Sequence, residues 1–163
     1  MRVSITSLSI VACLAVASST VAQSGKPSSG KPALRACEVL TRDMVAKYDT
    51  QDPKLRDLIP RHEEAIGSHG SSCDDGGIGV QLDPFLRSDV YRKSPPKDWQ
   101  AVSGVGDAAY FRNNGNRWAE LMVWTGTHHF TIQLSVPNGG TAESVKPNVM
   151  GLATALVAKL KSM

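Results

Sequence analysis

The sequence has few cysteines, few aromatic residues and almost no excess of charge of one sign. Its 163 residues include three cysteines and 6% aromatic residues, and 18 Lys and Arg stand against 15 Asp and Glu, a net charge of +3. An excess this small, dispersed along the chain, does not indicate nucleic acid or an anionic membrane as the partner. The hydrophobic share of 41% and the charged share of 20% are ordinary for a globular domain, which excludes a disordered chain and a coiled coil.

The sequence also lacks the motifs of several enzyme classes. Residues 104–109 match the dinucleotide fingerprint in form, but a strand and a turn follow where the nucleotide-binding helix would have to begin. Ser94 and Lys97 have the spacing of penicillin-recognising enzymes, but two adjacent prolines between them hold the chain extended. No catalytic triad, carboxylate pair or phosphate loop is evident, so the sequence predicts a protein that is not an enzyme.

The four histidines do not have the spacing of a metal site. His62 begins a sequence similar to the start of a zinc-protease helix, but Ile66 stands where the second histidine would be. His128 and His129 are adjacent at the start of a predicted strand, so we expect their side chains on opposite faces. We therefore predict no cofactor and no metal. The weaker alternative is a metal-binding protein that uses His128 or His129.

The first 22 residues have the pattern of a secretory signal peptide. Arg2 is their only charged residue, an apolar run follows, and Thr20, Val21 and Ala22 form a small-x-small cleavage sequence. We expect cleavage after Ala22, with Ala17 as the second choice. A membrane-spanning helix needs about 20 predominantly apolar residues, more than this run contains. The mature protein is therefore expected to be soluble and periplasmic or secreted.

Cys13 lies in a sequence similar to the lipid-attachment box of bacterial lipoproteins. The apolar stretch before it is very short and continues beyond it, and Leu14 is a poor residue to follow a lipid-modified cysteine. We therefore expect no lipid anchor at Cys13. Residues 23–33 are rich in Gly, Ser, Pro and Lys and should form a flexible tether. A single folded domain is expected over residues 34–163.

Cleavage leaves two cysteines, Cys37 and Cys73. An even number of cysteines in an exported chain indicates a disulfide, because the compartments outside the cytoplasm are oxidising. The competing interpretation is a redox or nucleophilic cysteine. The sequence has no Cys-x-x-Cys pair, and two acidic residues next to Cys73 disfavour a reactive thiolate.

Periodicity predicts helices at both ends of the domain and strands between them. Residues 37–48 have helical spacing with Thr41 as the cap, and Asp52 and Pro53 begin a second short helix. The last helix follows Ser144 as its cap, and its apolar face consists of Val145, Val149, Leu152, Ala153, Leu156 and Leu160. Strands are expected at residues 79–82, 108–112, 117–124 and 129–136, a loop at 68–79, and an irregular connection or edge element at 83–97. The predicted class is α+β, an antiparallel meander flanked by an N-terminal and a C-terminal helix.

Two surfaces are candidates for partner binding. The first is the densest basic cluster of the chain, together with the tyrosine inside it: Arg87, Tyr91, Arg92, Lys93 and Lys97. The second is one face of the 117–124 strand, where Trp118 and Trp124 lie at even spacing. The cluster suits an anionic envelope ligand or an acidic protein surface, although solvated loops often have this composition.

Several short motifs resemble those of a known family. They are a cysteine before a Leu-Thr helix start at residues 36–41, a Gly-x-Gly-Asp-Ala-Ala-Tyr sequence ending at Tyr110, and a closing Leu-Ala helix at 152–160. Over most of residues 37–160 the chain resembles a group of small bacterial exported proteins and lipoproteins of unknown function. The resemblance implies a PsbP-like α+β sandwich and a disulfide between Cys37 and Cys73. It supplies no catalytic residues.

The sequence thus predicts a binding or interaction module of the cell envelope, without catalytic activity. The alternative is an inhibitor or immunity-type protein that blocks a secreted hydrolase, with the Trp118 face or residues 87–97 as its contact. The partner would be an unknown envelope protein or an anionic envelope ligand.

Overall fold

The structure is a computed structural model, and it describes residues 34–85 and 88–163. The predicted signal peptide of residues 1–22, Cys13 and the predicted tether of residues 23–33 lie outside the described residues. Arg87 of the predicted binding cluster also lies outside them. The expectations for these residues stay predictions.

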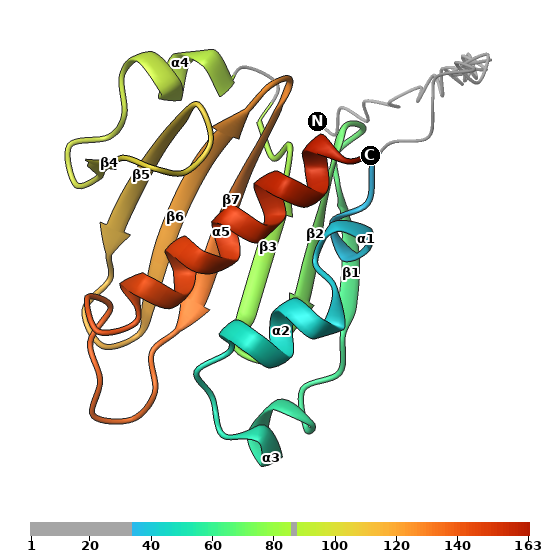
Figure 1. Cartoon of the computed structure of the whole chain (residues 1–163), viewed down its shortest axis with the longest axis vertical. Helices are drawn as coiled ribbons and strands as arrows, with labels where there is room; N and C mark the ends of the chain where they lie inside the picture. Colours follow the sequence, from blue (N-terminus) through green and yellow to red (C-terminus); the bar gives the residue numbers. More distant parts are fainter. Residues whose placement is uncertain (1–33, 86–87) are drawn as a thin grey trace, which may run out of the picture. The chain divides into compact units, whose positions relative to one another are not determined.

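Seven antiparallel strands form one sheet, with the order β1-β2-β3-β7-β6-β5-β4 (Figure 1). Neighbours in the sheet are also consecutive in the chain, except that β3 pairs with β7. The sheet therefore consists of two meanders joined edge to edge. The strands are β1 His62–Ile66, β2 Gly70–Asp75, β3 Ile78–Leu82, β4 Gln100–Val102, β5 Ala108–Asn113, β6 Trp118–Thr125 and β7 His128–Ser135.

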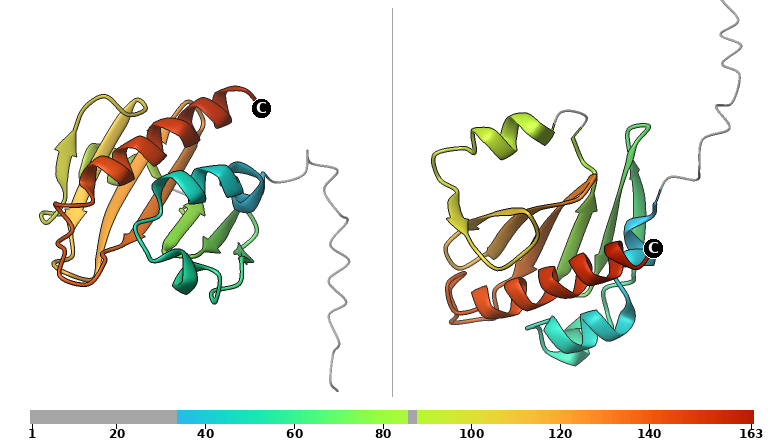
Figure 2. Two further views of the ribbon diagram at one scale, coloured as in Figure 1. Left: turned by 60° about the horizontal axis from the view of Figure 1, so that its bottom comes forward. Right: turned by 45° about the horizontal axis from the view of Figure 1, so that its top comes forward.

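Helices from both ends of the chain pack together on one side of this sheet. α1 (Ala36–Val39) and α2 (Arg42–Tyr48) precede the strands, and α5 (Lys146–Lys161) follows them. Figure 2 shows α5 running across the strands with α2 beside it. The predicted class is confirmed: an α+β domain with an antiparallel sheet flanked by an N-terminal and a C-terminal helix.

Two helix starts follow local sequence signals. The Thr41 hydroxyl accepts a hydrogen bond from the Met44 N–H at 3.3 Å, so Thr41 caps α2 as predicted. Asp52 accepts a hydrogen bond from the Lys54 N–H at 2.8 Å and begins α3 (Pro53–Arg56), with proline at the start of the helix. These caps fix where α2 and α3 begin and therefore which side chains lie between them.

The core lies between the sheet and α5. Along β6, Ala119, Leu121 and Val123 are fully buried in the same cluster as the residues of α5. The apolar face predicted for the last helix is confirmed, because all six of its residues are buried: Val145, Val149, Leu152, Ala153, Leu156 and Leu160.

The disulfide between Cys37 and Cys73 is confirmed, and it joins α1 to β2. The two Cα atoms are 5.0 Å apart, and the residues are separated by 36 positions in the sequence. Cys73 is completely buried within the core. The covalent bond thus connects the N-terminal helix to the interior of the sheet.

The loop predicted for residues 68–79 is wrong, because most of this segment belongs to β2 and β3. The segment before it forms β1, which the sequence did not indicate. Two polar residues, Ser71 and Asp75, are buried in β2, so the segment has no apolar alternation by which a strand is recognised. Its strand structure depends on pairing with β3, which is a tertiary effect.

Two smaller expectations also need correction. Ser144 does not cap the last helix: the cap residue is Val145, and the Ser144 hydroxyl donates to the Thr141 carbonyl at 2.6 Å. The region expected to be an irregular connection or edge element contains the short helix α4 (Ser88–Lys93). The Tyr110 hydroxyl donates to the Arg92 carbonyl at 2.9 Å, which ties α4 to β5.

Replacement of both disulfide cysteines by serine should lower the free energy of unfolding by about 3 to 4 kcal/mol, because a closed loop of this length restricts the unfolded chain. Urea denaturation with and without reductant measures the effect. The reductant should destabilise the wild type and leave the C37S/C73S variant unchanged. Equal stability of the wild type in both conditions would contradict the prediction.

Candidate functional site

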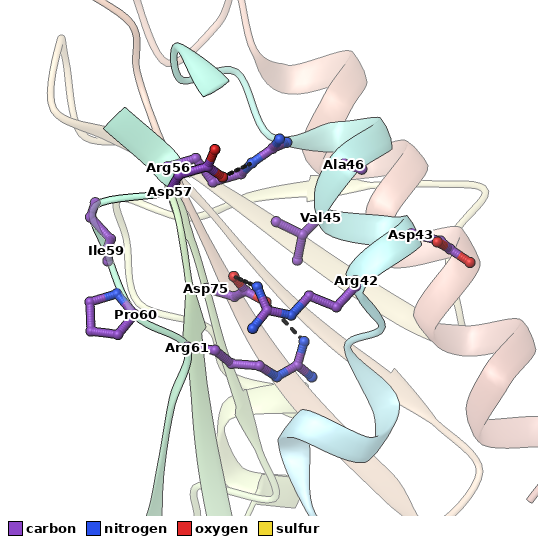
Figure 3. A pocket seen from close by; sticks show the side chains of 10 residues that line it. All are labelled: Arg42, Asp43, Val45, Ala46, Arg56, Asp57, Ile59, Pro60, Arg61 and Asp75. Carbon is purple, nitrogen blue, oxygen red and sulfur yellow. Dashed lines mark hydrogen bonds and ion pairs between the residues drawn. The ribbon is translucent and has the colours of Figure 1, made fainter. Parts of the chain in front are cut away.

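Three arginines from separate segments line one open hollow of about 420 Å³ (Figure 3). Arg42 is the first residue of α2, Arg56 the last residue of α3, and Arg61 immediately precedes β1. Asp75, at the end of β2, also lines the hollow. The rest of the lining is mostly small or aliphatic: Asp43, Val45, Ala46, Asp57, Ile59 and Pro60.

The fold places these residues through local caps and strand register. His62 pairs with Asp74 across the β1–β2 hairpin, so Arg61 and Asp75, one step further out, stand opposite each other. Thr41 begins α2 and sets the direction of Arg42. The main chain at Gly76 leaves room for Arg56, since a Cβ atom at this position would lie 2.5 Å from Arg56 Cγ.

Arg61 and Asp75 form a buried ion pair. The Arg61 Nη1 atom lies 2.8 Å from Asp75 Oδ2, and the Asp75 side chain is 2% exposed. The other terminal nitrogen of Arg61 donates to the carbonyls of Cys37 and Leu40, at the end of α1. Arg61 is thus fully used within the fold, and its removal would leave a buried carboxylate without its main partner. We assign Arg61 a positioning role.

Arg42 and Arg56 form weaker ion pairs than Arg61 does. The Arg42 side chain is 71% exposed, and its ion pair with Asp75 is long, at 3.5 Å. The Arg56 side chain is 26% exposed and packs beside Gly76, and its ion pair with the exposed Asp57 is also long, at 3.9 Å. In Figure 3 the Asp43 carboxylate points away from Arg42. Most hydrogen-bond donors of these two guanidinium groups are therefore free to bind a ligand, within the part of the chain that the structure describes.

The predicted basic cluster lies at a different place. Tyr91, Arg92 and Lys93 are exposed on α4, and Lys97 is exposed beyond it. These residues are accessible to a partner, and they do not line the arginine hollow.

The two predicted tryptophans have different surroundings. Trp124 is only 4% exposed, because its ring stacks on His129, and His129 stacks on Phe85. Phe85 also contacts Tyr91, with ring centroids 4.8 Å apart. Trp124 is therefore buried among aromatic neighbours and does not lie on the free surface of the described residues. Trp118 is half-buried and lines a separate shallow hollow.

Asp83 connects the two adjacent histidines. His128 Nδ1 lies 2.8 Å from one Asp83 carboxylate oxygen, and the His129 main-chain N–H donates to the other at 2.9 Å. The Phe85 N–H donates to His129 Nε2 at 3.1 Å, so Nδ1 of His129 carries the hydrogen and faces Asp83. Asp83 itself has φ of +48°, a left-handed conformation that aspartate tolerates better than most residues.

The environment of Asp83 lowers its pKa. Burial alone would raise the pKa of this carboxyl, but the hydrogen bonds from His129 and His128 outweigh burial and favour the charged form. Asp83 therefore stabilises the fold in its ionised state. It anchors the end of β3 to the start of β7.

The described residues contain no group of three or more His, Cys, Asp or Glu side chains arranged to hold a metal ion. The Nδ1 atoms of His128 and His129 lie 2.8 and 3.2 Å from the two oxygens of the Asp83 carboxylate, so both imidazoles reach the same side chain. In residues 34–85 and 88–163, no helix combines the length and apolar character that crossing a membrane requires.

Sequence reasoning missed the hollow between α2 and β1. Arg42, Arg56 and Arg61 were not among the predicted binding residues. The signal that could have found them is the hairpin β1–β2, which brings Arg61 beside Asp75. That hairpin was hidden because part of it has the composition of a loop.

Comparisons of the chain with protein-family models, with curated proteins and with solved structures found no match. The resemblance to small exported bacterial proteins therefore remains a prediction. The function has to be argued from the residues of the site.

The substitution Asp83→Asn should lower the free energy of unfolding by about 1 to 3 kcal/mol at neutral pH, because it removes charged hydrogen bonds and asparagine keeps the backbone conformation. The difference from the wild type should be present above pH 3.8, the ordinary pKa of the group, and disappear as the pH falls through the lower pKa of folded Asp83.

Urea denaturation at several pH values measures this difference. Asp89→Asn is the matched control, since Asp89 is exposed on α4. This control should change the stability by less than about 0.5 kcal/mol. If Asp83→Asn is as stable as the wild type at neutral pH, the anchoring role is wrong.

Proposed function

We propose that this protein is a binding module of the cell envelope without catalytic activity, and that the hollow beside α2 holds an anionic group of its ligand. The observation that carries the proposal is the state of Arg42 and Arg56. Both line one open hollow, and both leave most of their donors uncommitted. A phosphate, a sulfate or a carboxylate is the chemical complement of two such guanidinium groups.

Arg61 and Arg42 have different roles in this arrangement. Arg61 neutralises Asp75 at 2.8 Å, so the buried carboxylate does not need Arg42 as its main partner. Arg42 can therefore turn toward a ligand at the loss of one long contact. Guanidinium groups bind tetrahedral and planar oxyanions through two parallel N–H donors, which gives a defined geometry as well as charge.

The size and the lining of the hollow favour binding over catalysis. Its volume of about 420 Å³ falls in the range of sites for small ligands. Among the described residues that line it there is no Ser, Thr, Cys, His or Lys. Of its three aspartates, Asp75 is paired with Arg61, Asp57 is paired with Arg56, and the Asp43 carboxylate points away from Arg42 (Figure 3). These features support a site that holds a group without transforming it.

The location is part of the same proposal. The signal-like pattern of residues 1–22 supports export to the periplasm or the medium. The Cys37–Cys73 disulfide supports it as well, since disulfides persist in oxidising compartments. The ligand would then be an anionic component of the envelope or a protein that carries one.

Isothermal titration calorimetry of the protein with inorganic phosphate tests the proposal. Arg42→Ala and Arg56→Ala should each weaken phosphate binding roughly tenfold or more, because each removes charged hydrogen bonds to the anion. Arg42→Ala should keep the wild-type stability, because the Arg42 side chain is 71% exposed. Arg56→Ala should lose some packing, because the Arg56 side chain is 26% exposed and lies against Gly76, so urea denaturation confirms that this variant is folded before it is titrated.

Arg92→Ala is the matched control, because Arg92 is an exposed arginine on α4 outside the hollow. It should bind phosphate like the wild type. A wild type that binds no phosphate, or arginine variants that bind it unchanged, would refute the assignment of the hollow as an anion site.

A further inference from the structure

An apolar surface lies beside the arginine hollow. Leu55, Leu58 and Ile59 are all exposed, and Leu58 reaches 76% exposure. They account for three of the six large hydrophobic residues exposed in the described part of the chain, although they lie within five consecutive positions. Scattered exposed leucines are ordinary, whereas a group of aliphatic side chains in one segment marks a surface that contacts another apolar phase. We call these three residues the 55–59 patch.

The 55–59 patch is an ordered surface. The Leu58 N–H donates to the Leu55 carbonyl at 3.1 Å, and the Ile59 N–H donates to the Arg56 carbonyl at 3.0 Å. These bonds continue the turn of α3, so the three apolar side chains stand at helical spacings of three and four residues, on one side of that turn. Pro60 then ends the turn, and Arg61 is fixed by its buried ion pair with Asp75.

The patch and the anion site share one rim. Ile59 belongs to both, since it lines the hollow together with Arg42 and Arg56. Figure 3 shows Ile59 and Pro60 on the side of the hollow opposite α2. The charges beside the patch are mixed: Lys54 is exposed at the start of α3, and the Asp57 side chain, between Leu55 and Leu58 in the sequence, is 78% exposed and paired with Arg56. A ligand that occupies the hollow would thus meet aliphatic side chains directly beside the arginines.

We infer that this surface docks on a bilayer of anionic phospholipid, with one lipid phosphate in the arginine hollow and the 55–59 patch in the acyl-chain boundary. The inference rests on the proposed anion site and names the source of the anion. In a phospholipid the phosphate lies next to the hydrocarbon chains. On this surface the arginines lie next to the exposed aliphatic side chains, so each part of the lipid meets a complementary group.

The alternatives fit the surface less well. A free phosphate or a sugar phosphate would use the hollow but leave the leucines in water. A second copy of the chain would have to bring a carboxylate to the arginines and an apolar face to Leu58. Among the described residues, the exposed large hydrophobics outside the patch, Val90, Tyr91 and Met163, do not form such a face. A symmetric pairing of two 55–59 patches is the remaining arrangement, and the dimer outcome of the test below reports it. An anionic bilayer offers a phosphate to the arginines and hydrocarbon to the 55–59 patch at the same time.

Sedimentation of the purified protein with vesicles tests the inference. The vesicles contain phosphatidylcholine alone or phosphatidylcholine with phosphatidylglycerol, and inorganic phosphate is titrated in parallel. The wild type should bind the anionic vesicles more tightly than the neutral ones, and added salt should weaken this binding. All variants keep the same N-terminal residues, so differences among them report the substituted positions.

The substitution Leu58→Asp separates the two proposals. It should weaken binding to anionic vesicles roughly tenfold or more, because an aspartate replaces an aliphatic side chain in the acyl boundary. Its binding of inorganic phosphate should equal that of the wild type. Arg56→Ala should weaken both kinds of binding. Val90→Asp, an equally drastic change at an exposed apolar position on α4, should weaken neither.

Three results would overturn the docking inference. If Leu58→Asp binds anionic vesicles as the wild type does, the 55–59 patch does not enter the membrane, and the anion site stands without it. If the wild type forms a dimer that Leu58→Asp disrupts, a second copy covers the patch. If vesicle binding persists in Arg42→Ala and Arg56→Ala together, the lipid phosphate does not occupy the hollow. If the wild type binds no inorganic phosphate, the anion site itself is refuted.

Discussion

The buried ion pair between Arg61 and Asp75 is the interaction on which the N-terminal half of the structure depends. Asp75 ends β2 inside the protein, and only a fixed cation makes its burial tolerable. The same Arg61 side chain donates to the carbonyls of Cys37 and Leu40, so it also satisfies main-chain groups at the end of α1. One guanidinium group therefore joins α1, β1 and β2. The disulfide ties α1 to β2 a second time, through a covalent bond.

This ion pair also explains how the hollow can be both stable and available. Because Arg61 balances the buried carboxylate, Arg42 is left with one long contact and a largely exposed side chain. Arg61 thus stabilises the fold, whereas Arg42 remains available to bind a ligand. The net charge of +3 does not reveal this division, because some acidic residues of the segment, such as Asp52 and Asp49, accept hydrogen bonds from main-chain N–H groups. Overall charge describes steering at a distance, whereas a binding site depends on which donors remain free.

The second half of the molecule is organised differently. α5 covers the inner side of its strands, and hydrogen bonds from His128 and His129 to Asp83 join β3 to β7. The imidazoles of both histidines reach the Asp83 carboxylate. Trp124 was predicted on a recognition surface, but it is 4% exposed and stacks on His129. The Trp124 end of this strand face is therefore buried among the described residues.

Local signals were sufficient where neighbouring residues carry the information. Thr41 and Asp52 start helices through their own side chains. β7 alternates polar and apolar residues from His129 onward, and α5 has a continuous apolar face. The cysteine count in a chain with a signal-like start was enough to predict the disulfide. The sequence by itself thus determined the class of the fold, its main helices and its covalent link.

Only the tertiary structure decided the hairpin β1–β2, the arginine hollow and the apolar rim beside it. The hairpin has polar residues in its interior, and these are stable there because Arg61 comes from one strand end and Asp75 from the other. The hollow needs Arg42, Arg56 and Arg61 to approach across turns that no periodicity describes. The physical reason is the same in each case: burial, charge pairing and register act between residues distant in sequence, and they exist only once the chain has folded.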